Sequence, residues 1–178
     1  MVEEINKALN NYRTKWQALV SGRTDTSFFG QLVPVSVGWK VADVAAFDHA
    51  VALLRDHCDL VVHTRLNNRL IAKMVLRKPV TDWPLPVIKI MQVRPGSADA
   101  LGLDHIDFYS AKPPADIEAT LNAENLKWSH EVNHEGDKYP WASVWFDSTE
   151  AKIKQYTVLD IYANELTHTS ARIKQNKW

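Results

Sequence analysis

The order of apolar and polar residues predicts a helix, then a strand, a second helix and three more strands. Residues 3–22 carry apolar side chains three and four positions apart, which is the pattern of one helix face. This stripe consists of Ile5, Leu9, Tyr12, Trp16 and Leu19. Residues 33–42 alternate as a strand does, and residues 44–57 have the spacing of an amphipathic helix. Strand-like runs follow at 59–66, 70–77 and 86–94, with Asn67 and Asn68 at a tight turn. After the first helix, this stretch predicts a βαβββ unit.

The same pattern begins again after a short link at residues 95–102. Residues 103–110 alternate as a strand, and residues 113–125 predict a helix because the proline pair suits its first turn. Further strand candidates cover residues 127–134, 141–147 and 151–162. Two copies favour pairing over a repeat array, which needs about three or more. We therefore predict an α+β fold in which two paired βαβββ modules form a curved mixed sheet with a cleft, plus an N-terminal helix. The predicted segments are a helix and linker at 1–32, modules at 33–94 and 103–162, and a C-terminal tail at 163–178.

Composition and charge narrow the classes of function. Lysine and arginine number 21, as do aspartate and glutamate, so no excess charge attracts nucleic acid or an anionic membrane surface. No apolar run approaches the roughly 18 residues that a membrane-spanning helix needs. The N-terminus lacks the basic start and apolar core of a secretory signal, and the single cysteine, Cys58, allows no intramolecular disulfide. We therefore expect a soluble, cytoplasmic protein that contacts neither nucleic acid nor membrane.

The clearest candidate for chemistry is the run Leu-Asp-His-Ile-Asp-Phe-Tyr at residues 103–109. Alternation places His105, Asp107 and Tyr109 on one face of this strand. This polar face should border the cleft, where the imidazole could serve as a metal ligand. The corresponding strand of the first unit, residues 34–41, contains no histidine or carboxylate. The sequence therefore supplies half of a metal site and lacks the counterpart.

A tandem pair of βαβββ units with Asp-His-Ile in the first strand of one unit resembles the vicinal oxygen chelate superfamily. This is the group of glyoxalase, bleomycin-resistance proteins and extradiol dioxygenases. Within it the chain is most similar to the YecM-type bacterial proteins, through the stretches LNNRLIAKMVLRKPV, LDHIDFY with its preceding Pro-Gly link, and IKQY. The resemblance covers residues 33–162. It implies a half-barrel of paired modules whose cleft holds a divalent metal on ligands from the first and last strands of each module.

The resemblance implies four metal ligands, of which this chain keeps one. His105 matches the first-strand histidine of the second module. Gln92 lies where the last strand of the first module usually carries a glutamate, and Gln155 and Tyr156 lie in the last strand of the second module. One imidazole with neutral amides and a phenol leaves the charge of a divalent ion uncompensated. We therefore expect no cofactor on the usual ligand set, while a divalent metal held in another way stays open.

Strand alternation and the resemblance together give a set of candidate ligand-binding residues. The seven tryptophans could form an aromatic wall, with core packing as the alternative. The candidate cleft residues are His105, Asp107, Tyr109, Gln92, Tyr156, His63, Lys73 and Trp128. We predict that they bind a small polar or aromatic molecule. His105 would act as hydrogen-bond donor or general base, because its unperturbed pKa lies near neutrality. No residue is assigned as catalytic, and whether the protein is an enzyme stays open.

Two other classes of function remain. A metal-dependent lyase, isomerase or dioxygenase would need a rearranged ligand set, such as His105 and Asp107 with His63 or His130. A noncatalytic interaction module would use the N-terminal helix for partner docking or dimerisation, and a homodimer is compatible with every one of these functions. Residues 129–138 contain two histidines four positions apart but predict a polar hairpin, not a helical zinc motif. The sequence has no nucleophile elbow and no glycine-rich phosphate loop.

Overall fold

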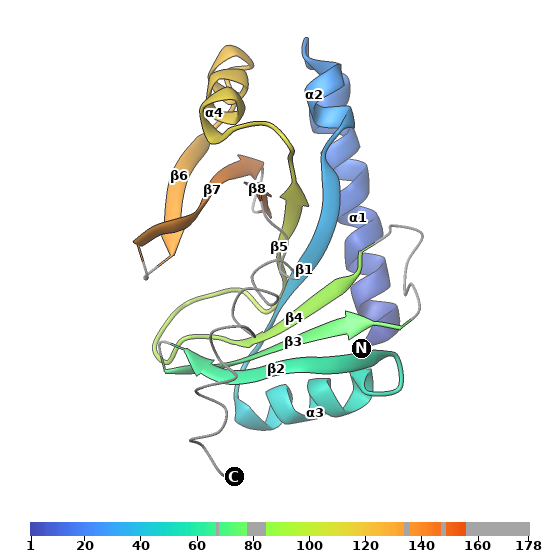
Figure 1. Cartoon of the computed structure of the whole chain (residues 1–178). Coiled ribbons are helices and arrows are strands. Elements are labelled where there is room, and N and C mark those ends of the chain that lie inside the picture. Colours follow the sequence, from blue (N-terminus) through green and yellow to red (C-terminus); the bar gives the residue numbers. More distant parts are fainter. Residues whose placement is uncertain (67, 78–84, 134–135, 147–148, 156–178) are drawn as a thin grey trace.

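The computed structural model describes residues 1–66, 68–77, 85–133, 136–146 and 149–155, which form an α+β protein around one curved sheet (Figure 1). The sheet has eight strands in the order β2-β3-β4-β1-β5-β8-β7-β6. The strands are β1 (Val33–Val41), β2 (Cys58–Leu66), β3 (Arg69–Leu76), β4 (Val87–Gln92), β5 (Gly102–Tyr109), β6 (Trp128–Asn133), β7 (Gly136–Phe146) and β8 (Thr149–Lys154). The helices are α1 (Val2–Ser21), α2 (Thr26–Gly30), α3 (Val44–Leu54) and α4 (Pro114–Ala123). The predicted α+β class and the two successive βαβββ orders are confirmed.

The two halves of the sheet have the same internal order of strands. In the first half β4 lies between β3 and β1, and in the second half β8 lies between β7 and β5. β1 runs parallel to β4, β5 runs parallel to β8, and antiparallel pairing of β1 with β5 joins the halves. The central strands are therefore the first and last strands of the two βαβββ units. The division of the chain into separate modules at 33–94 and 103–162 stays a prediction.

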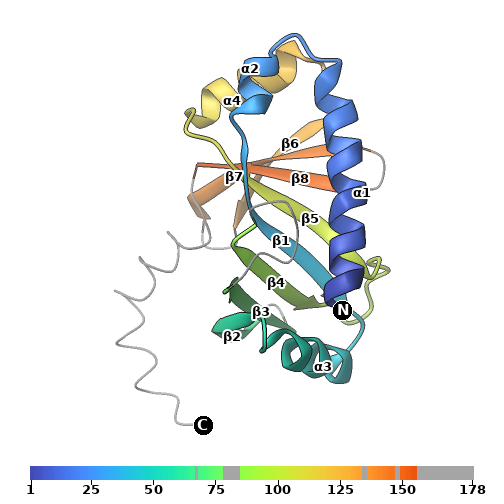
Figure 2. The ribbon, with the colours of Figure 1, turned by 90° about the vertical axis from the view of Figure 1, so that its right-hand side faces the viewer.

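Helices α1, α3 and α4 pack on one face of the sheet, here called the helix face. Their apolar residues share one buried cluster with alternate strand residues, including Val37, Ile88, Ile106 and Ile153. Figure 2 shows α1 running beside β1, β5 and β8, and α3 lying against β2, β3 and β4. None of the described helices is long and apolar enough to cross a membrane. Alternate residues of the central strands point to the opposite face.

The apolar stripe of α1 is buried within the chain. Ile5, Leu9, Tyr12 and Trp16 are each at most 6% exposed. Trp16 stacks on Phe108 of β5 with 4.6 Å between ring centroids. Burial of side chains of this size stabilises the fold by about 1.5–3 kcal/mol each. Dimerisation or partner docking through this stripe, one of the functions considered above, would require α1 to leave its own sheet.

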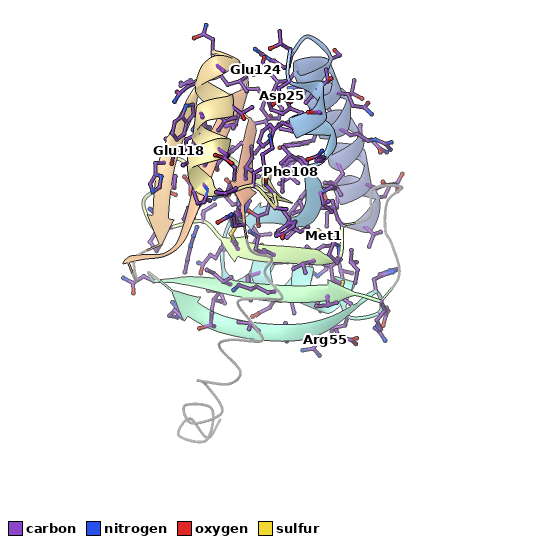
Figure 3. The ribbon with its side chains drawn as sticks, turned by 45° about the horizontal axis from the view of Figure 1, so that its top comes forward. Met1, Asp25, Arg55, Phe108, Glu118 and Glu124 are labelled. Carbon is purple, nitrogen blue, oxygen red and sulfur yellow. The ribbon has the colours of Figure 1, made fainter. Side chains whose placement is uncertain are left out.

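A short helix that the sequence pattern does not predict, α2, follows α1. Asp25 caps its N-terminus by accepting the backbone N–H of Phe28 at 2.9 Å. The Glu124 carboxylate, at the end of α4, accepts the backbone N–H groups of Thr24 and Asp25 at 3.2 and 2.7 Å. Figure 3 shows Asp25 and Glu124 near each other, at the ends of their elements. These bonds tie the turn between α1 and α2 to the second half of the molecule.

Candidate functional site

The face of the sheet opposite the helices, here called the polar face, carries a band of charged and hydroxyl side chains. Alternation along the central strands and β7 directs these side chains away from α1. The band consists of Ser36 and Lys40 of β1, Lys89 of β4, His105 and Asp107 of β5, Ser143 of β7, and Glu150, Lys152 and Lys154 of β8. All except Lys40 and Lys152 are at most 9% exposed. Charges buried to this degree need partners, and the members of the band supply them to one another.

An irregularity in the pairing of β1 with β5 brings Asp104 to the polar face. Gly38 pairs with His105, but the next residue of β1, Trp39, pairs with Leu103, so Asp104 has no partner in β1. An extra residue of this kind is a β-bulge, which bends the strand and redirects a side chain. As a result, the Asp104 carboxylate lies 2.7 Å from Nδ1 of His105. Strict alternation would place this carboxylate on the helix face.

Both ring nitrogens of His105 are engaged. Nδ1 faces the Asp104 carboxylate, which can only accept, so this network assigns the proton to Nδ1 and a lone pair to Nε2. The Lys89 ammonium lies 2.7 Å from Nε2 and donates to it. Burial lowers the pKa of His105 to about 3, and the positive charge of Lys89 acts in the same direction. The imidazole is therefore neutral at neutral pH and held as one tautomer.

Asp107 is fully buried and surrounded by three donors. The Lys89 ammonium and the Ser36 hydroxyl both donate to Oδ2. The Lys154 ammonium lies 2.9 Å from Oδ1. Burial alone would raise the pKa of Asp107, but the charges of Lys154 and Lys89 hold it well below its usual range. Asp107 is therefore an ionised counter-charge shared by two lysines from different halves of the sheet.

Burial has the opposite effect on these two lysines. It lowers the pKa of Lys89 to about 8, against the attraction of Asp107. It also lowers the pKa of Lys154, where Asp107 opposes the shift and Lys152 adds to it. A lysine whose pKa lies near neutrality can donate or accept a proton under ordinary conditions. The polar face thus combines a neutral imidazole, an ionised carboxylate and a weakly held proton on Lys89.

An aromatic ring borders this band on β7. The Trp141 ring centroid lies 5.4 Å from the ammonium nitrogen of Lys152 and 5.2 Å from that of Lys154. The indole N–H donates to the Ser143 hydroxyl at 3.0 Å, and this hydroxyl donates to the Glu150 carboxylate at 2.6 Å. The ring is half-buried, in contrast to the residues at the centre of the band. This side of the polar face can therefore contact both an apolar group and an anionic one.

The structure brings part of the predicted ligand-binding set together. His105 and Asp107 lie at the centre of the polar face, and Tyr109 follows on the same strand beside Lys154. Lys73 of β3 pairs directly with Lys89 on the neighbouring strand. In a sheet, directly paired residues point to the same face. His105, Asp107, Tyr109 and Lys73 therefore share the polar face.

Other members of that set lie elsewhere, and Tyr156 falls outside the described residues. Gln92 is the last residue of β4, and its side-chain oxygen accepts a backbone N–H of β3 at 3.3 Å. His63 of β2 lies on the helix face, where its ring centroid is 5.4 Å from that of Phe47. Trp128 of β6 also faces the helices, and its indole N–H donates to α4 at 2.9 Å. These side chains do not meet His105 because alternation and strand ends direct them away from it.

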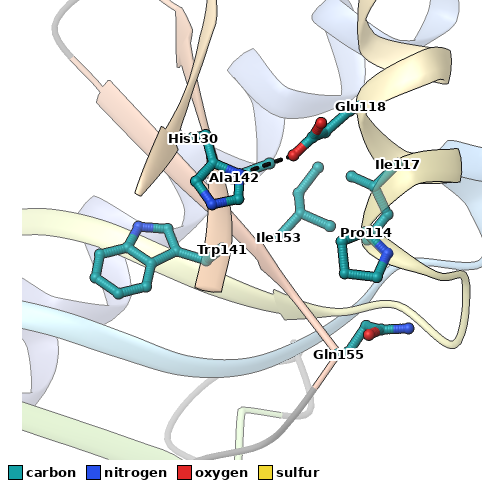
Figure 4. A pocket seen from close by; sticks show the side chains of 8 residues that line it. All are labelled: Pro114, Ile117, Glu118, His130, Trp141, Ala142, Ile153 and Gln155. Atoms are coloured by element: carbon teal, nitrogen blue, oxygen red, sulfur yellow. Dashed lines mark hydrogen bonds and ion pairs between the residues drawn. The ribbon is translucent and has the colours of Figure 1, made fainter. Parts of the chain in front are cut away.

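A small hollow beside α4 contains the other histidine considered as a metal ligand (Figure 4). His130 of β6 lies there with Nδ1 2.8 Å from the Glu118 carboxylate. Trp141 borders this hollow, but no residue of β5 lines it. The strands β6 and β7 around it pair antiparallel, and residues 134 and 135 of the hairpin predicted for 129–138 lie outside the described residues. His130 and His63 both face the helices, whereas His105 and Asp107 lie on the polar face. The rearranged metal site, which would combine His105 and Asp107 with one of these two histidines, is therefore not formed.

Sequence reasoning missed the lysines that organise the site. Lys89 lies between apolar residues of strand β4, and its position beside Gly38 follows from the register of β1 with β4. Lys152 and Lys154 alternate with apolar residues in β8 in the same way. A lysine between apolar residues of a strand indicates a buried ion pair, because lysine is almost never buried without a partner. The sequence pattern does not show which residue this partner is.

The described residues include one group of side chains with the donor types of a metal site. Asp104, His105 and Glu150 can offer donor atoms that all lie within 4.8 Å of one another. Each of these side chains already has an ammonium or hydroxyl partner on the polar face. A metal ion would have to displace those partners. The group therefore does not fit a resident metal in the arrangement that the structure has.

Comparisons with known proteins bear on the fold. No family model and no curated protein matches the chain. A solved structure described as structural-genomics protein EC4020 matches with a TM-score of 0.66 at 16% identity, over 92% of this chain and 88% of that one. Methylmalonyl-CoA epimerase from Mycobacterium tuberculosis matches with a TM-score of 0.49 at 13% identity, over 68% of this chain and 87% of that one. The first of these likenesses shows that the chain shares its fold with protein EC4020 over nearly its whole length.

Proposed function

We propose that the polar face binds a small polar or aromatic molecule around His105. The observation that carries this proposal is the band of buried charged groups on the four central strands. Burying charges costs free energy even when they are paired, and apolar residues at the same positions are often as stabilising or more so. Groups with strongly shifted pKa values gather at functional sites for this reason. A recognition site accounts for the band better than a contribution to stability does.

In this proposal His105 acts through Lys89. Its Nδ1–H is bonded to Asp104, and its Nε2 accepts from the Lys89 ammonium. The imidazole thus positions the lysine, and the lysine is the group that would meet a ligand. Trp141, and the 40% exposed Trp145 on the same strand, would contact the apolar part of that ligand. Whether turnover follows binding is a separate question that the proposal does not need.

We also infer that the chain is a YecM-type member of the vicinal oxygen chelate superfamily. Two βαβββ orders in one sheet support this inference, as do the stretches LDHIDFY and LNNRLIAKMVLRKPV. The first and last strands of the two units are the central strands, and the polar band lies on them. A cytoplasmic location and a homodimer remain expectations of the same proposal.

The test is a ligand screen with matched histidine variants. The purified chain is screened by thermal shift against small carboxylic acids, phosphates, amides and phenols, and each hit is measured by calorimetry. We expect His105→Ala to weaken the binding of a hit by about tenfold or more. His130→Ala, which removes a hydrogen-bonded histidine on the helix face, should bind as the wild-type protein does. A folded His105→Ala protein with full affinity contradicts the proposal.

A further inference from the structure

Whether the site suits a metal ion depends on the residues that strand pairing places beside His105 on the neighbouring strands. The resemblance implies a divalent ion held by the first and last strands of each module, which are β1, β4, β5 and β8. Strand pairing places Gly38 between Lys89 and His105, and places Glu150 on the other side of His105. The facing positions are therefore glycine, lysine, histidine and glutamate.

Gly38 leaves no room for a ligand from β1. A Cβ atom at this position would lie 2.5 Å from Cε1 of His105 and 2.8 Å from each ring nitrogen. Such distances are far inside van der Waals contact, so the imidazole of His105 occupies the space that a side chain at position 38 would need. Strand β1 thus contributes only backbone at this point.

Lys89 places a positive charge where a metal would have to bind. Its ammonium lies 2.7 Å from Nε2 of His105 and donates to Oδ2 of Asp107. A metal ion would need the same lone pairs. Two positive charges a few ångströms apart in a buried site repel strongly. The ammonium and a metal ion therefore exclude each other.

The remaining carboxylates of the polar face are matched by lysines as well. The pairs are Asp104 with Lys40 at 2.8 Å, Glu150 with Lys152 at 3.6 Å, and Asp107 with both Lys89 and Lys154. Lys73 lies opposite Lys89 on the next strand. Lys40 also lies 3.0 Å from the Asp99 carboxylate. Among the described residues, the polar face thus presents ammonium donors from β1, β3, β4 and β8, and ammonium groups are donors that hold an anionic ligand by charge-assisted bonds.

We propose that Lys89 is the built-in cation of this site in place of a metal ion, and that the polar face recognises the carboxylate of a small organic acid. Lys89 and Lys154 approach different oxygens of Asp107. They are therefore already arranged around one carboxylate, and a second carboxylate can be held by the same type of charge-assisted bond. Trp141, 5.2 Å from the Lys154 ammonium, would contact the body of the acid. The ligand class rests on the proposed function, whereas the role of Lys89 as the cation does not.

The first test asks whether removal of the ammonium creates a metal site. The wild-type protein, Lys89→Glu and Lys89→Gln are titrated with Co²⁺ and Zn²⁺ by calorimetry, and the absorption spectrum of Co²⁺ reports imidazole ligation. We expect no such spectrum from the wild-type protein. Lys89→Glu should bind at least about 100-fold more tightly, because it adds a carboxylate beside a freed imidazole. If Lys89→Glu does not fold, Lys89→Gln should still gain about tenfold.

Two controls locate the gain at His105. Lys73→Glu makes the same charge change on the same face, one strand away, and should not produce the Co²⁺ spectrum of a bound imidazole. The double variant Lys89→Glu/His105→Ala should lose the gain. One equivalent of Co²⁺ on the wild-type protein that is lost in His105→Ala contradicts the proposal. Failure of both Lys89 variants to gain affinity contradicts it as well.

The second test compares benzoate with benzamide, which has a similar shape and no charge. We expect benzoate alone to raise the unfolding temperature of the wild-type protein, and Lys154→Gln to weaken benzoate binding by about tenfold or more. Lys112→Gln, which changes a partly exposed lysine near α2, is the matched control and should bind benzoate normally. Equal binding of the two compounds overturns carboxylate recognition and leaves small-molecule binding intact. Binding of neither compound overturns the ligand class, while the metal titrations still test Lys89 separately.

Discussion

The two halves of the sheet agree on the helix face and differ on the polar face. On the helix face, Val37 and Ile88 of the first half and Ile106 and Ala151 of the second half are all fully buried. On the polar face, the first half pairs Gly38 with Lys89, and the second half pairs His105 with Glu150. The repeated fold depends on the apolar residues that meet the helices. The residues between them, which point to the polar face, can differ from one half to the other. In this chain, the polar-face residues of one half contact those of the other half.

The contact between the polar-face residues of the two halves has two parts that can be tested separately. The first is steric, because the imidazole from the second half fills the space above a glycine of the first half. The second is electrostatic, because Asp107 of the second half is the counter-charge for Lys89 of the first. If the two halves were independent, the effect of a substitution in one half on the free energy of unfolding would not depend on the residues of the other half.

The largest effect is expected from removal of the charge that the halves share. Asp107→Ala leaves the ammonium groups of Lys89 and Lys154 buried without their carboxylate. Loss of one partner from a buried ion pair lowers the free energy of unfolding by about 3–5 kcal/mol. The control is Asp59→Ala, which removes an exposed pair with Arg77 and should cost less than about 1 kcal/mol. Urea denaturation measures both losses, and similar values would show that the buried band does not couple the halves.

A methyl group at position 38 should be the next most damaging change. Gly38→Ala forces the His105 ring to move, and overpacking of a buried site costs about 1–3 kcal/mol. Gly30→Ala is the control, since a Cβ at that position meets nothing within 4 Å. In a His105→Ala background, Gly38→Ala should cost much less, because the ring is gone. Equal cost in both backgrounds, measured as a double-mutant cycle, would refute the steric link.

Acid should destabilise the protein through His105. Its pKa is about 3 in the folded protein and 6.5 in the unfolded chain, so between these values only the unfolded chain binds the proton. The stability that comes from the neutral ring is therefore complete above pH 6.5 and is lost as the pH falls toward 3. At about 1.4 kcal/mol per pH unit, the loss between pH 6.5 and pH 5 is about 2 kcal/mol. Denaturation across this range should show a shallower pH dependence for His105→Gln, and an unchanged slope would assign the effect to other groups.

The smallest effect is expected at the link between the N-terminal helices and the second half. The carboxylate of Glu124 accepts hydrogen bonds from the Thr24 hydroxyl and from the backbone N–H groups of Asp25 and Thr24, and these hydrogen bonds keep its pKa below the usual range. Glu124→Gln keeps the shape but removes the charge. We expect a small drop in unfolding temperature and faster amide hydrogen exchange at Thr24 and Asp25. Glu118→Gln, on the same helix, should leave these two amides unchanged.

Much of the fold follows from periodicity along the chain. The stripe from Ile5 to Trp16 predicts α1, and the alternation of residues 103–109 predicts both β5 and the face that carries its polar residues. The helix α2 has no such signal, because five residues are too few to show a helical period. Its start depends on the Asp25 cap and on bonds to Glu124, which is distant in sequence.

Periodicity along the chain predicts less of the candidate site than of the fold. His105, Asp107 and Tyr109 can be placed on one face from their own strand. Asp104 joins His105 only because of a bulge against β1, which alternation cannot show. The resemblance suggested Gln92 for the last strand of the first module, whereas the register of β4 with β1 brings Lys89 to this level. Lys89, and not Gln92, takes this position because of how strands from different parts of the chain align.

Local patterns in the sequence are sufficient to predict the three longer helices, most strands, the paired βαβββ order and the shared face of His105, Asp107 and Tyr109, because period and burial are properties of neighbouring residues. The tertiary structure alone decides that a glycine at position 38, a lysine at position 89 and a histidine at position 105 meet at one point. Their meeting depends on strand register, which arises from contacts between segments far apart in the chain. For this protein, that register decides whether the cation of the site is a metal ion or a lysine.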